Sequence, residues 1–181
     1  TKDGDRVRSY YVGFRTDKFE EVDEDDEPEI VTKQEIGYFT CEESILDEYC
    51  SDCPAQLATE QGTPMYKWDN VRTTLKCINT KELHYVKVPE NHIVIDFDIP
   101  DENGDKCLER NLEAASKWPP TYGEYSKSGQ GVHLHYIYSG DPKKLSSIYS
   151  DHIEVKVYTG KSSLRRKLSK CNGLPIATIS S

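Results

Sequence analysis

Residues 92–98 read HIVIDFD, an apolar run into which two aspartates are set. Successive side chains of a β-strand point to opposite faces, so Asp96 and Asp98 share one face while Ile95 and Phe97 share the other. Two neighbouring carboxylates repel each other, and a divalent cation relieves that repulsion. Because Mg²⁺ and Mn²⁺ prefer oxygen ligands, the segment predicts a strand that carries part of a metal site. A strand with an ordinary solvated face is the alternative.

Two later segments alternate polar and apolar residues in the same way. The run VHLHYIY predicts a strand whose polar face carries His133 and His135. The run IEVKV predicts another, with Glu154 and Lys156 on its polar face. A mixed sheet that contained all three strands would bring these side chains close to the two aspartates.

The run SKSGQG lies directly before the histidine strand. Glycines let backbone N–H groups approach an anion closely, and serine hydroxyls add further hydrogen bonds. The run therefore predicts a phosphate-binding loop that is formed by Ser126, Ser128, Gly129 and Gly131. A plain hairpin loop is the alternative.

Helical and extended patterns alternate irregularly along the rest of the chain. Thr40 and Glu43 have the spacing of a capping box, and Asp105 and Asp141 are candidate N-caps. Helices are expected from residue 40, over residues 106–118 and from residue 142 to residue 149. Further strands are expected over residues 10–14, near residue 30 and over residues 83–88. This order predicts an α/β or α+β fold with a mixed sheet and flanking helices.

The net charge of -9 is distributed unevenly over the 181 residues. Residues 17–29 contain nine acids and one lysine, a net charge of -8, and are expected to form a solvated acidic loop. Residues 156–170 contain six basic residues and no acid. Such a local basic strip suits phosphates even when the whole chain is acidic.

Neither a signal peptide nor an apolar run of membrane-spanning length occurs in the sequence. We therefore expect a cytoplasmic protein without membrane contact. The chain begins at Thr1 without an initiator methionine and stops within a strand-like pattern, so we expect a fragment of a longer protein.

The six cysteines indicate a reducing compartment rather than a disulfide framework. Cys50 and Cys53 form a C-x-x-C pair, and Cys41 and Cys77 could complete a tetrahedral set for a structural Zn²⁺. The cysteine-rich element would then span residues 41–77. Free buried thiols are the favoured interpretation.

Three motifs in order carry a family resemblance. Residues 94–98 (hydrophobic-hydrophobic-Asp-x-Asp), 126–133 (Ser-x-Ser-Gly-x-Gly-x-His) and 153–154 (hydrophobic-Glu) resemble the signatures of the archaeo-eukaryotic primase superfamily. The likeness is greatest to the primase-polymerases of phages and plasmids. It covers about half the chain, which makes residues 91–181 the expected catalytic core. Residues 1–90 would form the N-terminal part of the same compact unit.

The resemblance implies an RRM-like core joined to a further α/β unit, with the active site between the sheets. It implies that Asp96, Asp98 and Glu154 hold two Mg²⁺ or Mn²⁺ ions. It implies that His133 and the preceding serine–glycine loop contact the phosphates of the incoming nucleotide. The basic residues assigned to triphosphate or template phosphate are Lys156, Lys161, Arg165 and Arg166.

The implied activity is nucleotidyl transfer to a primer 3′-hydroxyl, or the initiation of primers, on a single-stranded DNA template. The substrates would be ribo- or deoxynucleoside triphosphates. A helicase, as a domain or a separate protein, is the expected partner, and the bacterial host cell is the expected location if a phage encodes the chain. Many relatives also carry a zinc element.

Two other functions are open at the level of sequence. His133 and His135 have the His-hydrophobe-His spacing of rolling-circle nicking endonucleases, for which Tyr149 or Tyr158 would be the nucleophile. A non-catalytic RRM-like module would instead bind single strands by stacking bases on Tyr136 and Tyr138 and by attracting phosphates to the basic strip. The polymerase should bind a nucleoside triphosphate only with Mg²⁺ or Mn²⁺, the nickase should cleave single strands, and the binding module should ignore metal ions.

Overall fold

The computed structural model describes residues 38–180, and the chain from Phe39 onward forms one compact unit. The expected strands at residues 10–14 and near residue 30, and the acidic loop at residues 17–29, lie outside the described residues. Within this part of the chain, no helix is both long and apolar enough to cross a membrane.

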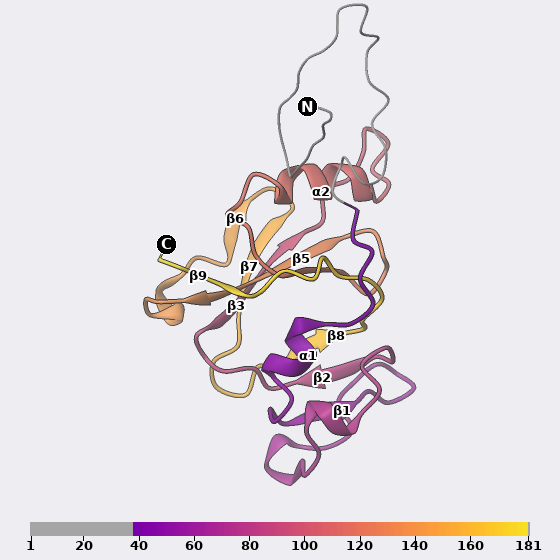
Figure 1. Ribbon diagram of the computed structural model, residues 1–181, viewed down its shortest axis with the longest axis vertical. Helices are drawn as coiled ribbons and strands as arrows, with labels where there is room; N and C mark the ends of the chain where they lie inside the picture. The colour runs from indigo at the N-terminus through magenta and orange to yellow at the C-terminus, as the bar shows by residue number, and fades with distance from the viewer. Residues whose placement is uncertain (1–37, 181) are drawn as a thin grey trace, which may run out of the picture. The chain divides into compact units, whose positions relative to one another are not determined.

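Short helices and nine strands make up the unit (Figure 1). The helices are α1 (Ile45–Tyr49), α2 (Leu108–Ala115) and the 3₁₀ turns η1 (Trp68–Asn70), η2 (Leu75–Cys77) and η3 (Pro142–Lys144). The strands are β1 (Ala55–Leu57), β2 (His84–Val86), β3 (His92–Phe97), β4 (Gly123–Tyr125), β5 (Val132–Tyr138), β6 (Ile148–Ser150), β7 (Ile153–Val157), β8 (Leu164–Arg166) and β9 (Ala177–Ile179).

The strands form two sheets. The large sheet has the order β4-β5-β3-β7-β6, with neighbouring strands antiparallel, and β9 joins β5 in the parallel direction. The small sheet has the order β1-β2-β8 and is antiparallel throughout. The predicted α+β class with a mixed sheet is confirmed. Because β8 pairs with β2, the stretches before and after residue 90 share a sheet.

One face of the large sheet packs against α2. Leu112 and Ala115 of this helix are buried on that face. Trp118, just beyond the helix, makes edge contact with the ring of Phe97 on β3 at a centroid distance of 5.9 Å. This face is therefore apolar, as the alternation of residues 92–98 requires.

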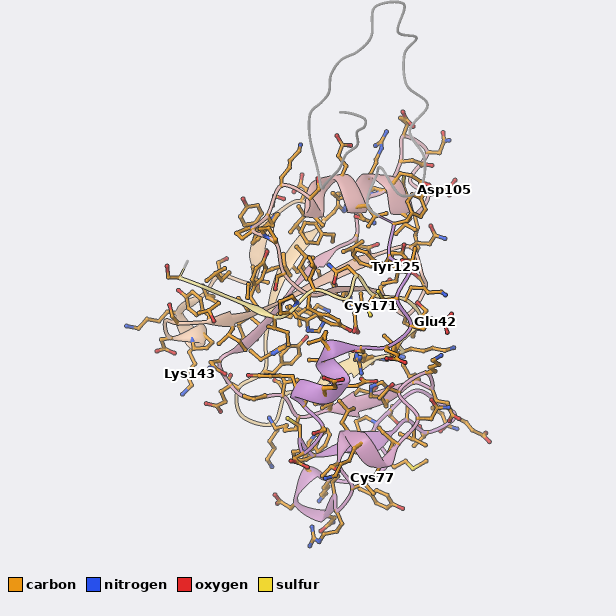
Figure 2. All side chains as sticks on the ribbon, viewed as in Figure 1. Glu42, Cys77, Asp105, Tyr125, Lys143 and Cys171 are labelled. Atoms are coloured by element: carbon orange, nitrogen blue, oxygen red, sulfur yellow. The ribbon has the colours of Figure 1, made fainter. Side chains whose placement is uncertain are left out.

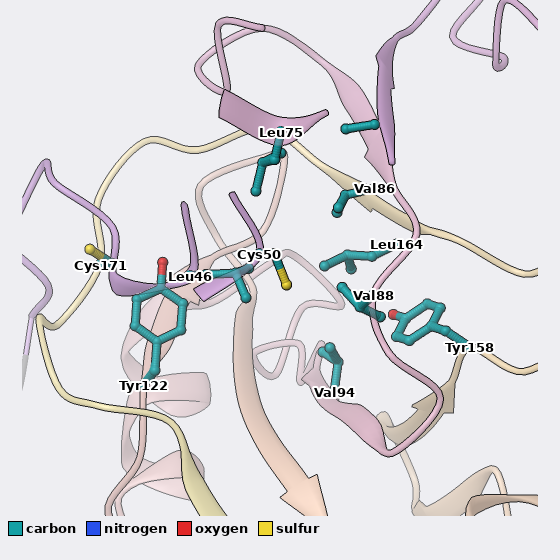
Figure 3. Packing of buried hydrophobic residues seen from close by; sticks show 11 residues of the cluster. Leu46, Cys50, Leu75, Val86, Val88, Val94, Tyr122, Tyr158, Leu164 and Cys171 are labelled. Atoms are coloured by element: carbon teal, nitrogen blue, oxygen red, sulfur yellow. The ribbon is translucent and has the colours of Figure 1, made fainter. Parts of the chain in front are cut away.

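The opposite face of the large sheet packs in part against α1 and the small sheet (Figure 3). Val94 of β3 contributes to this shared core, as do Leu46 of α1 and Leu164 of β8. The two sheets thus share one core, and the polar residues of β3, β5 and β7 lie on the face that looks toward the small sheet.

Each of the three predicted helices has a wrong boundary, and α2 also ends at Ala115 rather than at residue 118. Ser44, rather than Thr40, caps α1, and its hydroxyl accepts from the N–H of Asp47. Helix α2 begins after Cys107, because Asp105 is instead part of a tight turn in which its N–H donates to the carboxylate of Asp101.

The expected helix from residue 142 ends after one turn. Asp141 does cap this turn, as predicted, by accepting from the N–H of Lys143. The chain then continues into β6, which pairs with β7. The hydrogen bonds between these strands stabilise an extended conformation in a segment whose local sequence predicted a helix.

Candidate active site

The three predicted polar strands lie next to one another in the large sheet. Asp96 on β3 is directly opposite His133 on β5 and directly opposite Glu154 on β7. Residues that face each other in an antiparallel pair project from the same side of the sheet. Glu154, Asp96 and His133 therefore form a row across adjacent strands, which we call the central row. The expectation that one sheet would gather these strands is confirmed.

Two side chains from the neighbouring strands contact the carboxylate of Asp96. Its Oδ1 lies 3.2 Å from Nε2 of His133, and its Oδ2 lies 3.4 Å from Nζ of Lys156. The same ammonium group lies 4.0 Å from Oε1 of Glu154. Burial favours the protonated acid, but the hydrogen bonds and charges of His133 and Lys156 outweigh it, so the pKa of Asp96 lies below its ordinary value. The row thus presents an ionised carboxylate to which cations are drawn.

Asp98 lies one residue beyond the end of β3 and is exposed. Its N–H donates to the carbonyl of His152 at 2.9 Å, so the backbone at this position is held against the turn between β6 and β7. Glu154 is exposed as well. Across residues 38–180, no three His, Cys, Asp or Glu side chains stand close enough together to make a ready-formed metal site. A cation shared with Asp96 would require the exposed Asp98 and Glu154 side chains to rotate toward it, and their exposure leaves room for this.

The serine–glycine loop lies against the end of β3. A Cβ atom on Gly131 would be 3.0 Å from the carbonyl oxygen of Phe97, the residue between the two aspartates. The N–H of Gly129 donates to the carbonyl of Ser126, and the N–H of Gly131 donates to the Ser126 hydroxyl. Because these amides already donate within the loop, we expect an anion to contact the exposed hydroxyl of Ser128, which accepts from the N–H of Gln130 and lies 3.2 Å from the hydroxyl of Ser126.

The predicted basic residues do not gather at one place. Lys156 is the one that contacts the central row. Lys161 is exposed in the connection between β7 and β8. Arg165 is exposed on β8, with its guanidinium beside Gly62. Since Arg165 and Arg166 alternate along this strand, they project to opposite faces of the small sheet.

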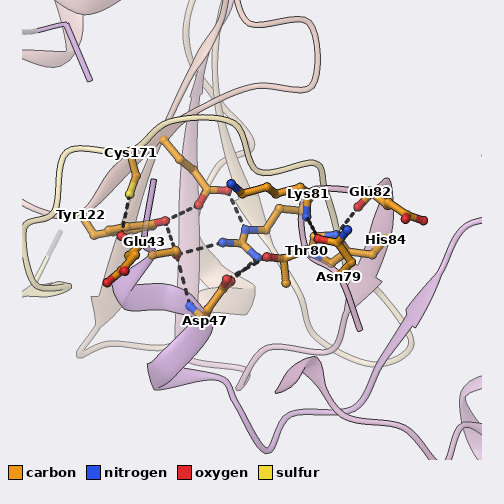
Figure 4. A network of polar contacts seen from close by, with 12 residues as sticks. Glu43, Asp47, Asn79, Thr80, Lys81, Glu82, His84, Tyr122 and Cys171 are labelled. Atoms are coloured by element: carbon orange, nitrogen blue, oxygen red, sulfur yellow. Dashed lines mark hydrogen bonds and ion pairs between the residues drawn. The ribbon is translucent and has the colours of Figure 1, made fainter. Parts of the chain in front are cut away.

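Arg166 is buried between the sheets, with 2% of its surface exposed. Its Nε donates to Oε1 of Glu124 at 2.7 Å, its Nη1 lies 2.7 Å from Oδ1 of Asp47, and its Nη2 donates to the Ser44 hydroxyl. Figure 4 shows this polar network, which also includes Tyr122. Burial opposes ionisation of Glu124, but Arg166 lowers the pKa of that carboxyl to about 2. A phosphate would reach Arg166 only by breaking these contacts, so the geometry gives this residue a structural role instead of the predicted phosphate contact.

A pair of buried histidines lies beside the central row, on the same face of the sheet. Nε2 of His92 and Nδ1 of His135 are 2.8 Å apart, and neither side chain is exposed. Burial lowers the pKa of both imidazoles, that of His92 to about 4. His135 shares a face with His133 but is engaged with His92, so the two imidazoles of the His-x-His motif are not presented together to solvent.

Sequence reasoning missed Asn111. This residue lies on the face of α2 that packs against the large sheet, three residues after Leu108 and four before Ala115. It is fully buried. A polar residue within the apolar stripe of a helix was the available signal, because a buried amide must find hydrogen-bond partners.

The four cysteines of the predicted zinc site are not brought together. Cys41 pairs through its backbone with Cys171. Figure 2 places Cys171 and Cys77 well apart, so Cys41 and Cys77 belong to different regions of the unit. Cys50 is buried in the shared core with Cys53 packed against it, whereas Cys41 and Cys77 are exposed, so burial of the thiols holds for only part of the set.

A comparison of the chain with protein-family models found no match, and neither did a comparison with curated proteins.

Proposed function

We propose that this chain is the catalytic domain of a DNA primase-polymerase, similar to those of phages and plasmids. The observation that carries the proposal is the central row, in which the key residues of all three motifs occupy adjacent positions on one face of a sheet. A single motif has a high rate of chance occurrence, whereas three motifs that meet in space are a more specific signal.

Asp96, Asp98 and Glu154 are the proposed ligands of Mg²⁺ or Mn²⁺. Their carboxylate oxygens are the donors that such cations prefer, and the ammonium of Lys156 between Asp96 and Glu154 marks a place where positive charge is favoured. Bound cations would neutralise charge on the reacting phosphates and promote ionisation of the attacking hydroxyl.

The reaction would be the transfer of a nucleotide to a primer 3′-hydroxyl on a single-stranded DNA template. The new bond joins this oxygen to the α-phosphorus, and the bond to the pyrophosphate oxygen breaks. His133 and Lys156 would turn from Asp96 to the negatively charged phosphates and stabilise them there. The exposed hydroxyl of Ser128 would donate a hydrogen bond to the same group.

The proposed function also implies a protein partner and a cellular location. A helicase in the full-length protein or beside it would supply the unwound template. The domain would act in the cytoplasm of a bacterial host cell.

The geometry favours this function over the two alternatives. A nicking endonuclease needs both imidazoles of its His-x-His motif on one metal ion, but His135 is buried against His92. A stacking platform needs exposed aromatic rings, but Tyr136 is buried and its hydroxyl donates to the carbonyl of Pro119, and only Tyr138 of the two candidate rings is partly exposed. A carboxylate row that faces an anionic strand would also oppose binding without a cation.

Calorimetric titration of the whole chain with a deoxynucleoside triphosphate tests the proposal, with Mg²⁺, Mn²⁺ or EDTA in parallel cells. We expect binding that requires the cation and is lost in the Asp96→Ala/Asp98→Ala double variant. Glu113→Ala removes an exposed acid from α2, on the other side of the sheet, and serves as the matched control. Binding of single-stranded DNA in EDTA, without any metal-dependent nucleotide binding, would instead support the non-catalytic module.

A further inference from the structure

The buried side chain of Asn111 connects two backbone segments that come from different motifs. Its Oδ1 accepts a hydrogen bond from the N–H of Ile99 at 2.7 Å, and its Nδ2 donates to the carbonyl of Gln130 at 2.9 Å. Ile99 directly follows Asp98. Gln130 belongs to the serine–glycine loop that precedes His133. One amide group therefore bonds the end of the acidic strand and the loop at the same time.

The two segments already touch close to this point. Gly131, the residue after Gln130, lies so near the carbonyl of Phe97 that a Cβ atom would be only 3.0 Å from it. The contact leaves no room for a side chain at that position. Asn111 thus lies at a junction where the backbone of the loop runs close to the end of β3.

The helix that carries Asn111 is itself held at this junction. The guanidinium Nη1 of Arg110, the preceding residue, donates to the carbonyl of Pro100 at 3.1 Å. The neighbouring Leu112 is buried against the large sheet. The amide of Asn111 is therefore presented from a supported position, and both of its functional groups are used.

We propose that Asn111 is a positioning residue that sets the distance between the carboxylate of Asp98 and the phosphate-contacting loop. This inference rests on the proposed function. Asp98 would hold a cation and Ser128 would contact the phosphate that the cation neutralises, so their separation determines whether both can act on one nucleotide. Displacements of about 1 Å in such an arrangement can reduce rates by roughly a hundredfold.

Two variants of Asn111 separate the two hydrogen bonds. Asn111→Ala removes both. Asn111→Asp keeps an acceptor for the N–H of Ile99 but loses the donor for the carbonyl of Gln130. Leu112→Ala is the matched control, because it creates a cavity in the same helix without removing either hydrogen bond.

The experiment uses the whole chain and combines two measurements at a temperature at which every variant is folded. The first is the dissociation constant for a deoxynucleoside triphosphate with Mn²⁺. The second is hydrogen exchange of the Ile99 amide and of the loop at residues 126–131. We expect Asn111→Ala to weaken nucleotide binding by roughly tenfold to a hundredfold and to speed exchange at both places. Asn111→Asp should speed exchange in the loop while Ile99 stays protected.

The control decides the interpretation. If Leu112→Ala lowers the melting temperature to a similar degree but leaves nucleotide affinity and exchange at Ile99 unchanged, the positioning role is supported. If affinity falls equally in Leu112→Ala and Asn111→Ala, the effect is one of stability and the inference is overturned.

Failure of the proposed function would give a different result. Wild-type protein would then bind no metal–nucleotide complex, whatever the state of Asn111. Under that outcome the role toward a nucleotide is excluded, although faster exchange at Ile99 and the loop in Asn111→Ala alone would still identify a structural clamp.

Discussion

Oδ1 of Asp96 lies 3.2 Å from Nε2 of His133, directly across the boundary between β3 and β5. These residues are 37 positions apart in the sequence and belong to different motifs. Their contact, together with that of Lys156 on the other side, keeps the carboxylate ionised at one-fifth exposure. The same contacts would have to loosen when a cation and a nucleotide bind, so each partner of Asp96 has a testable role.

Replacement of either aspartate should abolish catalysis without unfolding the domain. We expect Asp96→Ala and Asp98→Ala each to eliminate primer extension, because each removes a proposed cation ligand. Extension of a labelled primer on a single-stranded template measures the activity, and circular dichroism checks the fold. Full activity in both variants would refute the assignment.

His133→Ala should weaken nucleotide binding more than DNA binding. The imidazole is proposed to contact the phosphates of the incoming nucleotide and has no assigned contact with the template. The two dissociation constants, measured by titration and by fluorescence anisotropy, provide the comparison. Equal losses for both ligands would exclude a specific role at the triphosphate.

Lys156→Gln should increase the affinity for Mn²⁺ alone by a few-fold. The ammonium lies within 3.4 Å of Asp96 and 4.0 Å of Glu154, so it competes with a cation for the same carboxylates. A partly exposed ion pair of this kind contributes about 0.2–1 kcal/mol, which limits the expected gain. Titration with Mn²⁺, monitored by water proton relaxation, measures it. Lys144→Gln, which changes an exposed lysine in η3, should leave the affinity unaltered.

Loss of Arg166 should destabilise the domain strongly. Arg166→Met would leave Glu124 and the partly buried Asp47 without their cation, and breaking a buried ion pair typically costs about 3–5 kcal/mol. Urea denaturation measures the change in the free energy of unfolding. Arg165→Met on the same strand alters an exposed side chain and should shift this free energy by less than about 0.5 kcal/mol. Similar values for the two arginines would show that the network does not hold the sheets together.

Stability should fall in mildly acidic solution because of His92 and His135. Burial lowers the pKa of both in the folded state, to about 4 for His92, while an unfolded histidine titrates near about 6.5. Below that pH the unfolded chain binds more protons than the folded one. Stability is therefore lost progressively as the pH falls from about 6.5 toward about 4, by up to about 1.4 kcal/mol per pH unit for each histidine.

Urea midpoints at pH 7.5, 6.0 and 5.0 measure this dependence. A His92→Gln/His135→Gln variant removes both titrating groups and should show a shallower dependence over the same interval. An unchanged slope in that variant would assign the acid sensitivity to other groups.

The polar faces of the three central strands could be predicted from local sequence patterns. Alternation is a local property of a strand, so the runs around Asp96, His133 and Glu154 identified which side chains share a face. The run of residues 132–138 even gave the observed bounds of β5. Asp141 and Pro142 likewise predicted the start of the turn at residue 142, since Asp is favoured as an N-cap and Pro at the first helical position.

The partners of these side chains depend on which segments meet when the sheets pack, and no local pattern predicts that. The basic strip that suggested a phosphate contact for Arg166 does not reveal that β8 pairs with β2, and that pairing places the guanidinium beside Glu124 in the interior. The role of His135 likewise depends on His92, which lies 43 residues earlier in the chain. The role of Asn111 depends on hydrogen bonds to two separate segments, at Ile99 and at Gln130. Local patterns fix the direction of a side chain, whereas burial and long-range hydrogen bonds are fixed only when the sheets pack together.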